Sequence, residues 1–148
     1  MSNAEPNLIE SMNALLSSSY VLFLKTQNYH WNVEGHMFQF LHELFEAQYT
    51  DLFEANDEIA ERIRALGEYA PGSFTAFKDY TKIKESKEHP DAMGMVKNLA
   101  LDHETMAKIC QDVIEAGQAA NDEVTVDLAI ARKGVHEKTH WMLTSHLK

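Results

Sequence analysis

Hydrophobic and aromatic residues recur along most of this chain at the three- and four-residue spacing of an amphipathic helix, as at Leu8, Met12 and Leu15. Gly35 interrupts the first run of this pattern, and Gly67, preceded by basic residues, ends the second. The pattern predicts four long helices, over about residues 8–33, 38–66, 91–116 and 122–146.

A long connection, residues 68–90, separates the second and third predicted helices. It opens with Pro71-Gly72, and inside it a short helix is predicted to begin at Ser73. Gly117 and Asn121 mark the last turn between helices. Four helices with one long crossover predict an all-α, ferritin-like four-helix bundle with a short extra helix in the crossover. At 148 residues the chain is expected to form a single domain, residues 1–148.

Composition indicates a globular protein, with 45% hydrophobic residues. A single cysteine, Cys110, excludes an intrachain disulfide and fits a reducing cytoplasm. The chain has no run of about 18 apolar residues that would predict a membrane span. The first residues lack the basic start and apolar stretch of a secretory signal. We therefore expect a cytoplasmic protein with no membrane association.

The net charge of −10 bears on the partners of the protein. Polyanions are bound by Lys and Arg that neutralise phosphates, but no such residue precedes Lys25, and only Lys148 follows Lys138. Neither tail supplies a basic patch, so DNA binding through the tails is not expected. An acidic protein can still carry a local patch of basic residues outside its tails, so DNA binding by another route stays open. The acidity favours attraction of cations.

Histidine and carboxylate side chains in the first half of the chain suit a metal site. Nitrogen and oxygen donors of this mixed type fit a divalent iron-like ion, and zinc or manganese would also fit. Along the second helix, His42 and Glu46 form one pair with a spacing of four residues, and Asp57 and Glu61 form a second pair with the same spacing. The two members of each pair lie on the same face of the helix. The candidate ligands are His30, His42, Glu46, Asp57 and Glu61.

These five residues cannot all meet within one chain. His42 and Asp57 lie roughly 22 Å apart along the axis of the second helix, and a metal bonded at about 2 Å on each side cannot span that distance. A hairpin around Gly35 brings His30 level with His42. If two copies of the second helix pack antiparallel about residues 48–52, His42 of one chain faces the second pair of the other. A two-fold dimer with two identical interface sites is therefore predicted.

Each candidate ligand also has an ordinary structural interpretation. His30 also suits a core or capping role, and Asp57 and Glu61 also suit a solvated helix face. Spacing alone leaves metal binding and a structural role about equally open. A di-metal enzyme with its site inside one bundle needs two Glu-x-x-His motifs, and the chain has one, at residues 137–140.

The segment KTQNYHWNVEGHMFQFLHELFEAQYTDLFEANDEIAERIRALG closely resembles the Dps family, the DNA-binding proteins from starved cells, which are ferritin-like mini-ferritins. The ending HEKTHWMLTSHL resembles the last helix of that family, so the resemblance spans nearly the whole chain. The matching positions of the long core motif include His30-Trp31, Leu41-His42, Tyr49, Asp57 and Ala60-Glu61-Arg62.

This resemblance implies a hollow dodecamer, built from two-fold dimers, that oxidises Fe(II), preferably with hydrogen peroxide, and stores ferric mineral. Such a ferroxidase would protect DNA and cell from oxidative stress and could associate with the nucleoid. Many relatives bind DNA through Lys-rich tails, which this chain lacks. Two alternatives are DNA compaction without catalysis and a cage without ferroxidase activity. The complete set of candidate ligands disfavours the second.

The family implies roles for several residues of this chain. Trp31 would sit beside the ferroxidase centre, where it would either intercept oxidising equivalents or serve only in packing. Asp122 and Asp127 lie where relatives line iron-entry pores with acids, and Asp122 equally suits a helix N-cap. Carried over by position, the iron ligands (Fe2+/Fe3+) are His30, His42 and Glu46 from one subunit and Asp57 and Glu61 from the other.

Overall fold

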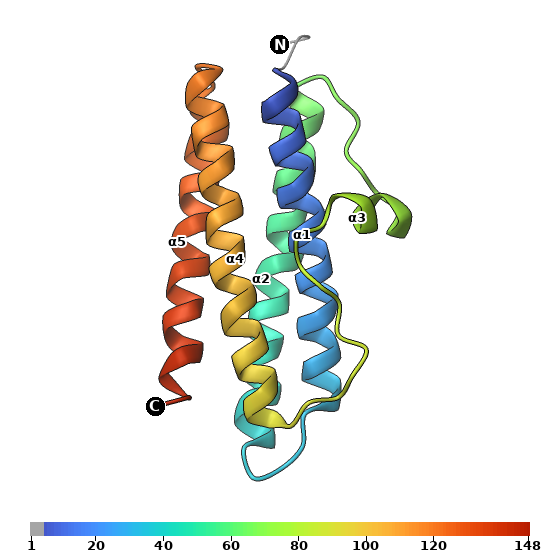
Figure 1. Ribbon diagram of the computed structural model, residues 1–148, viewed down its shortest axis with the longest axis vertical. Helices are drawn as coiled ribbons and strands as arrows, with labels where there is room; N and C mark the ends of the chain where they lie inside the picture. Colours follow the sequence, from blue (N-terminus) through green and yellow to red (C-terminus); the bar gives the residue numbers. More distant parts are fainter. Residues whose placement is uncertain (1–4) are drawn as a thin grey trace.

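The computed structural model describes residues 5–148, which form five helices and, within that range, no strand. It is an all-α four-helix bundle with the short helix α3 in its crossover, as the sequence predicts (Figure 1). None of the helices in this range is long and apolar enough to cross a lipid bilayer. The helices are α1 (Pro6–Asn32), α2 (Phe38–Ala65), α3 (Phe74–Tyr80), α4 (Ala92–Ala119) and α5 (Glu123–Ser145).

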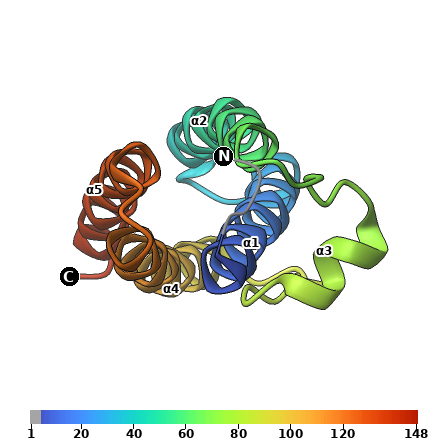
Figure 2. The ribbon, with the colours of Figure 1, turned by 90° about the horizontal axis from the view of Figure 1, so that it is seen from above.

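Two antiparallel hairpins, α1–α2 and α4–α5, build the bundle (Figure 1). The crossover runs back along the molecule from the end of α2, so that α2 and α4 point the same way. Seen along the bundle axis, the order around the bundle is α1, α2, α5, α4 (Figure 2). Of the four pairs of neighbouring helices around the bundle, α2 and α5 pack together least closely. Ion pairs bridge it, from Arg132 to Asp51 at 3.0 Å and from Arg62 to Asp122 at 2.8 Å.

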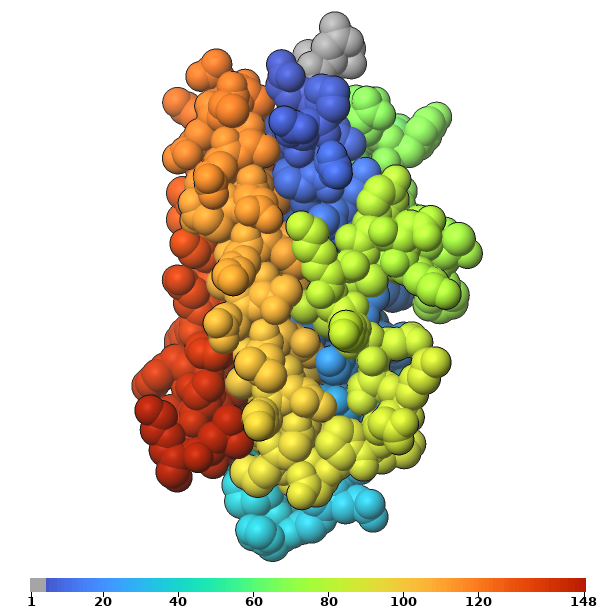
Figure 3. Space-filling model, in the orientation of Figure 1, coloured from blue at the N-terminus to red at the C-terminus, as the bar shows by residue number. Residues whose placement is uncertain are grey.

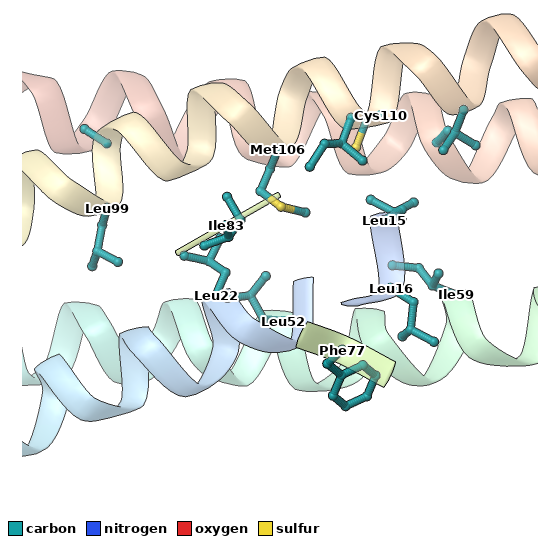
Figure 4. Close-up of a cluster of buried hydrophobic side chains, with 14 of the residues drawn as sticks. Leu15, Leu16, Leu22, Leu52, Ile59, Phe77, Ile83, Leu99, Met106 and Cys110 are labelled. Atoms are coloured by element: carbon teal, nitrogen blue, oxygen red, sulfur yellow. The ribbon is translucent and has the colours of Figure 1, made fainter. Parts of the chain in front are cut away.

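The apolar stripes of the four long helices meet inside the bundle, where side chains such as Leu15, Leu52 and Met106 point toward one another (Figure 4). The crossover adds Phe77 and Ile83 to this core. Burial of such side chains is the main source of stability for a bundle of amphipathic helices.

The crossover is also fixed to the bundle by polar contacts, and it covers part of α1 on the face seen in Figure 3. The buried Lys25 ammonium donates to the Lys84 carbonyl at 2.9 Å and pairs with Asp102 at 2.8 Å. Desolvation raises the pKa of Asp102, although its bond to Lys25 acts in the opposite direction. The short helix begins close to the predicted position, at Phe74, and Ser73 is its N-cap, because the Ser73 hydroxyl accepts from the Ala76 amide.

One predicted boundary is wrong. The sequence pattern places Gly117 in the turn before the last helix, but α4 continues through it to Ala119. The turn lies at Asn121, which adopts a left-handed φ of 57°. Gly117 instead allows α5 to approach closely, because a Cβ atom there would lie 2.7 Å from Val126 Cγ2. Asp122 has the capping role that the sequence leaves open beside a pore-lining one, since its carboxylate accepts from the Thr125 amide.

We expect Gly117→Ala to destabilise the bundle and Gly134→Ala to stabilise it. Alanine gains about 1 kcal/mol over glycine in a helix interior. At Gly117 the contact with the stiff Val126 side chain outweighs this gain, because overpacking costs about 1–3 kcal/mol. Gly134, inside α5, serves as the matched control, because a Cβ atom there would meet no other side chain or helix within 4 Å. Urea unfolding measures the free energy of unfolding of both variants. Equal changes in the two variants would contradict the close approach at Gly117.

Candidate metal centre

The two candidate histidines meet where α1 ends and α2 begins. A tight connection containing Gly35, with a positive φ of 108°, turns the chain between the helices. The imidazole rings of His30 and His42 stack with centroids 3.8 Å apart and planes inclined by 12°. His30 is buried and His42 is half-buried. The hairpin therefore brings together two nitrogen donors from different helices, as the sequence predicts.

Reciprocal hydrogen bonds orient both rings. His30 Nδ1 lies 2.6 Å from the His42 carbonyl oxygen, and His42 Nδ1 lies 2.7 Å from the His30 carbonyl oxygen. A carbonyl can only accept, so each Nδ1 is the protonated donor. In the neutral form of each ring, the lone pair is therefore on Nε2. Metal-binding histidines commonly donate their second N–H to a carbonyl or carboxylate, which fixes the tautomer and the ring direction.

Glu46 completes the part of the candidate site that one chain contributes. It lies one helical turn beyond His42 on α2, and its Oε1 atom is 3.8 Å from His30 Nε2. Its side chain is 58% exposed, so the carboxylate is free to reach an incoming cation. An oxygen donor therefore faces one of the free imidazole nitrogens.

Asp57 and Glu61 are exposed on the later turns of α2, away from the histidines along the same helix axis. Within residues 5–148, no group of three or more His, Cys, Asp or Glu side chains is close enough to hold a metal ion. The four donors on α2 are thus divided between two regions of that helix, which is what the axial distance requires. That they bind metal stays a prediction.

Trp31 follows His30 on α1 but points outward, with 60% of its surface exposed. In the part of the chain that the structure describes, its indole makes no ring contact with another aromatic side chain. Its role beside the centre stays a prediction. Tyr49, whose ring contacts His30 edge-on at 5.2 Å, is among the positions that match the family, but the sequence motif predicts no role for it. Its spacing from His42 and Glu46 on α2, seven and three residues, is the signal that could have placed it.

Two further histidines form a buried pair that the sequence pattern does not predict. His103 on α4 and His136 on α5 are joined by an Nδ1–Nδ1 hydrogen bond of 2.9 Å. Burial and the nearby Arg132 and His140 lower the pKa of His103 to about 3. Burial, His103 and Arg132 lower the pKa of His136 well below its usual value. Both rings are therefore neutral in the folded protein at neutral pH.

The neutral pair predicts loss of stability in acid. The unfolded chain protonates these histidines below about pH 6.5, whereas the folded chain does so only at much lower pH. The stabilising contribution is complete above that pH and falls as pH decreases, by about 1.4 kcal/mol per pH unit for each histidine. Urea unfolding between about pH 8 and pH 5 should show a shallower pH dependence for His136→Gln. The control His89→Gln, at an exposed position, should keep the pH dependence of the wild type. An unchanged pH dependence in His136→Gln would contradict the role of the buried histidine pair.

The bundle with one long crossover is the architecture of ferritin-like proteins. The model of the ferritin-like domain family matches residues 9–148. An uncharacterised low temperature-induced protein of Nostoc sp. is 39% identical over 143 residues, which cover 95% of this chain and 80% of the relative.

Other relatives narrow the class. DNA protection during starvation protein 2 of Bacillus anthracis is 36% identical over 140 residues, with 95% of this chain and 96% of the relative covered. The crystal structure of the Dps protein from Vibrio cholerae, a member of a broad superfamily of ferritin-like diiron-carboxylate proteins, superposes with a TM-score of 0.92. That match has 33% identity and covers 95% of this chain and 89% of that one. The chain belongs to the Dps family.

Proposed function

We propose that this protein is a ferroxidase and iron-storage mini-ferritin. It oxidises Fe(II), preferably with hydrogen peroxide, at sites shared between two subunits, and stores the ferric mineral inside a hollow dodecamer. Residues 1–148 form the single ferritin-like domain of each subunit, and the protein acts in the cytoplasm. Removal of Fe(II) and peroxide protects DNA and cell, because these two reagents together generate hydroxyl radical. This protection needs no contact with DNA.

The observation that carries the proposal is the pair of imidazoles whose Nδ1 atoms are both bound to backbone carbonyls. Their Nε2 lone pairs are free, and Glu46 lies 3.8 Å from one of them. Such an incomplete set suits a site that a second subunit completes. A two-fold axis near the middle of α2 would bring the partner subunit's Asp57 and Glu61 to this end of the helix.

Exposed apolar side chains on the same helices support a dimer of this kind. Phe53, which lies on α2 between the two donor regions, is 65% exposed, and Leu24 on α1 is 44% exposed. Exposed apolar surface of this kind is typical of subunit interfaces. Their burial would favour association, so that the contact that forms the site also stabilises the dimer.

The donor types suit the proposed chemistry. Neutral imidazole nitrogens and ionised carboxylates bind Fe(II), and the carboxylates favour the ferric product. Two Fe(II) ions together give two electrons to hydrogen peroxide, and with two protons the O–O bond is cleaved to two water molecules. Because both electrons are delivered within one site, no hydroxyl radical is released. The protein's part is to hold the two ions together with carboxylates aimed at them.

Anaerobic protein loaded with Fe(II) should react much faster with hydrogen peroxide than with an equal concentration of oxygen. We expect a difference of about tenfold or more, equivalent to a barrier difference of about 1.4 kcal/mol. Stopped-flow absorbance of the ferric product measures the rate, and titration should give two Fe(II) oxidised per peroxide. Equal rates with the two oxidants would contradict the peroxide preference. Oxidation no faster than that of free Fe(II) would overturn the proposed function.

A further inference from the structure

A phenylalanine ring stacks on one of the two candidate histidines. Phe38, the first residue of α2, lies one helical turn before His42, so the two side chains share a helix face. Their ring centroids are 4.9 Å apart, and their planes are inclined by 22°. The His30 ring also stacks on His42, at 3.8 Å. The three rings therefore form one stack where α2 begins.

His42 is the middle ring of this stack. Two rings on the same face of an imidazole would overlap at these centroid distances, so Phe38 and His30 cover opposite faces of His42. His30 is buried, whereas His42 is half-buried and Phe38 is 39% exposed. Phe38 thus lies between the outer face of the His42 ring and the solvent.

The hydrogen bond of His42 does not by itself fix the direction of its Nε2 atom. His42 Nδ1 lies 2.7 Å from the His30 carbonyl oxygen, which sets the position of Nδ1. The ring can still tilt about the line from its Cβ atom to Nδ1, because the second side-chain torsion of histidine has a broad minimum. Such a tilt moves Nε2, which lies off that line. Rings packed against both faces of the imidazole prevent the tilt.

Resting on the proposed ferroxidase function, we propose that Phe38 is a positioning residue that holds His42 Nε2 in the direction in which it binds Fe(II). The phenyl ring needs no contact with iron and takes no part in electron or proton transfer. A bound cation draws electron density from the imidazole, and the π-face of Phe38 stabilises the positive charge that results. Loss of the phenyl ring should therefore weaken metal binding through His42 while every donor atom is retained.

Binding of Co(II) to the assembled protein measures this effect without oxidation of iron. Co(II) follows Fe(II) in the affinity order of divalent metals, and its visible absorption depends on coordination geometry. Phe38→Leu should weaken Co(II) binding about threefold to tenfold, less than the loss of about 10–100-fold that follows removal of a hydrogen-bonding partner of a metal ligand. Phe38→Tyr retains a ring and should restore both the affinity and the absorption spectrum of the wild type.

Phe40→Leu is the matched control for loss of an aromatic ring from the start of α2. Phe40 is 51% exposed, and its ring contacts His146 rather than a candidate ligand. Phe40→Leu should therefore bind Co(II) with the affinity and the spectrum of the wild type. Size-exclusion chromatography checks that each variant assembles, and Phe38→Met serves as a second variant without a ring if Phe38→Leu does not assemble.

A double-mutant cycle shows whether Phe38 acts through His42. In a His42→Ala background, Phe38→Leu should cause no further loss of Co(II) affinity, because the imidazole that Phe38 orients is gone. An equal loss of affinity in both backgrounds would show that Phe38 acts on the general stability of the site, and would overturn the proposal.

The outcomes separate this inference from the function on which it rests. Unchanged Co(II) affinity in Phe38→Leu, no recovery in Phe38→Tyr, or equal weakening by Phe40→Leu overturns the role of Phe38. Each of these results leaves the ferroxidase function intact when the wild type oxidises Fe(II) rapidly. A wild-type protein that neither binds Co(II) nor oxidises Fe(II) overturns both proposals.

Discussion

Replacing His30 and Asp57 together by alanine is expected to abolish rapid Fe(II) oxidation by peroxide. The change removes one ligand from each half of the proposed interface site, so neither half can hold iron in place. Loss of partners that only orient metal ligands costs about 10–100-fold in affinity or activity, and loss of the ligands themselves should cost at least as much. Stopped-flow measurement of ferric product should give a rate close to that of free Fe(II).

A second double variant controls for nonspecific effects of charge and surface. His36 and Glu58 are an exposed histidine and an exposed carboxylate close in sequence to the proposed ligands, and we assign neither a role in the site. His36→Ala with Glu58→Ala should oxidise Fe(II) at the wild-type rate. Circular dichroism checks that both variants remain folded, since loss of the buried His30 hydrogen bond costs about 1–3 kcal/mol. Unchanged oxidation in His30→Ala with Asp57→Ala would remove these residues from the site.

The helices could be predicted from the sequence because their signals are local. Apolar spacing identifies the buried stripe of each long helix, and the N-caps of α3 and α5 are Ser73 and Asp122, residue types that commonly cap helices. Gly117 shows where such reasoning fails. A glycine signals a helix end when only the local chain is considered. Here, however, glycine is required at position 117 because Val126 of α5 approaches the backbone of α4 closely. That contact depends on how two helices pack, which one segment of sequence does not reveal.

The candidate site likewise has features that could be predicted from the sequence and features that could not. The spacing of His42 and Glu46, and the distance to Asp57, follow from helix geometry and could be worked out in advance. The reciprocal bonds between each Nδ1 and the other histidine's carbonyl could not, because they depend on the register of the α1–α2 hairpin. The buried pair of His103 and His136 likewise requires the register of α4 against α5.

Mixing two inactive variants tests the shared site most directly. In a dimer of one His30→Ala subunit and one Asp57→Ala subunit, one site carries both substitutions and the other carries neither. Random association makes about half of the dimers mixed, so about a quarter of all sites should be intact. The two variants would be unfolded and refolded together, or co-expressed, and compared with each variant treated alone.

We expect each single variant alone to lack rapid peroxide-dependent oxidation of Fe(II), and the mixture to regain about a quarter of the wild-type amplitude. Such recovery requires ligands from two chains, because no subunit in the mixture carries all five ligands. If every site were built within one chain, mixing would restore nothing. Oxidation in the mixture that does not exceed the average of the two variants alone would therefore contradict the inter-subunit centre.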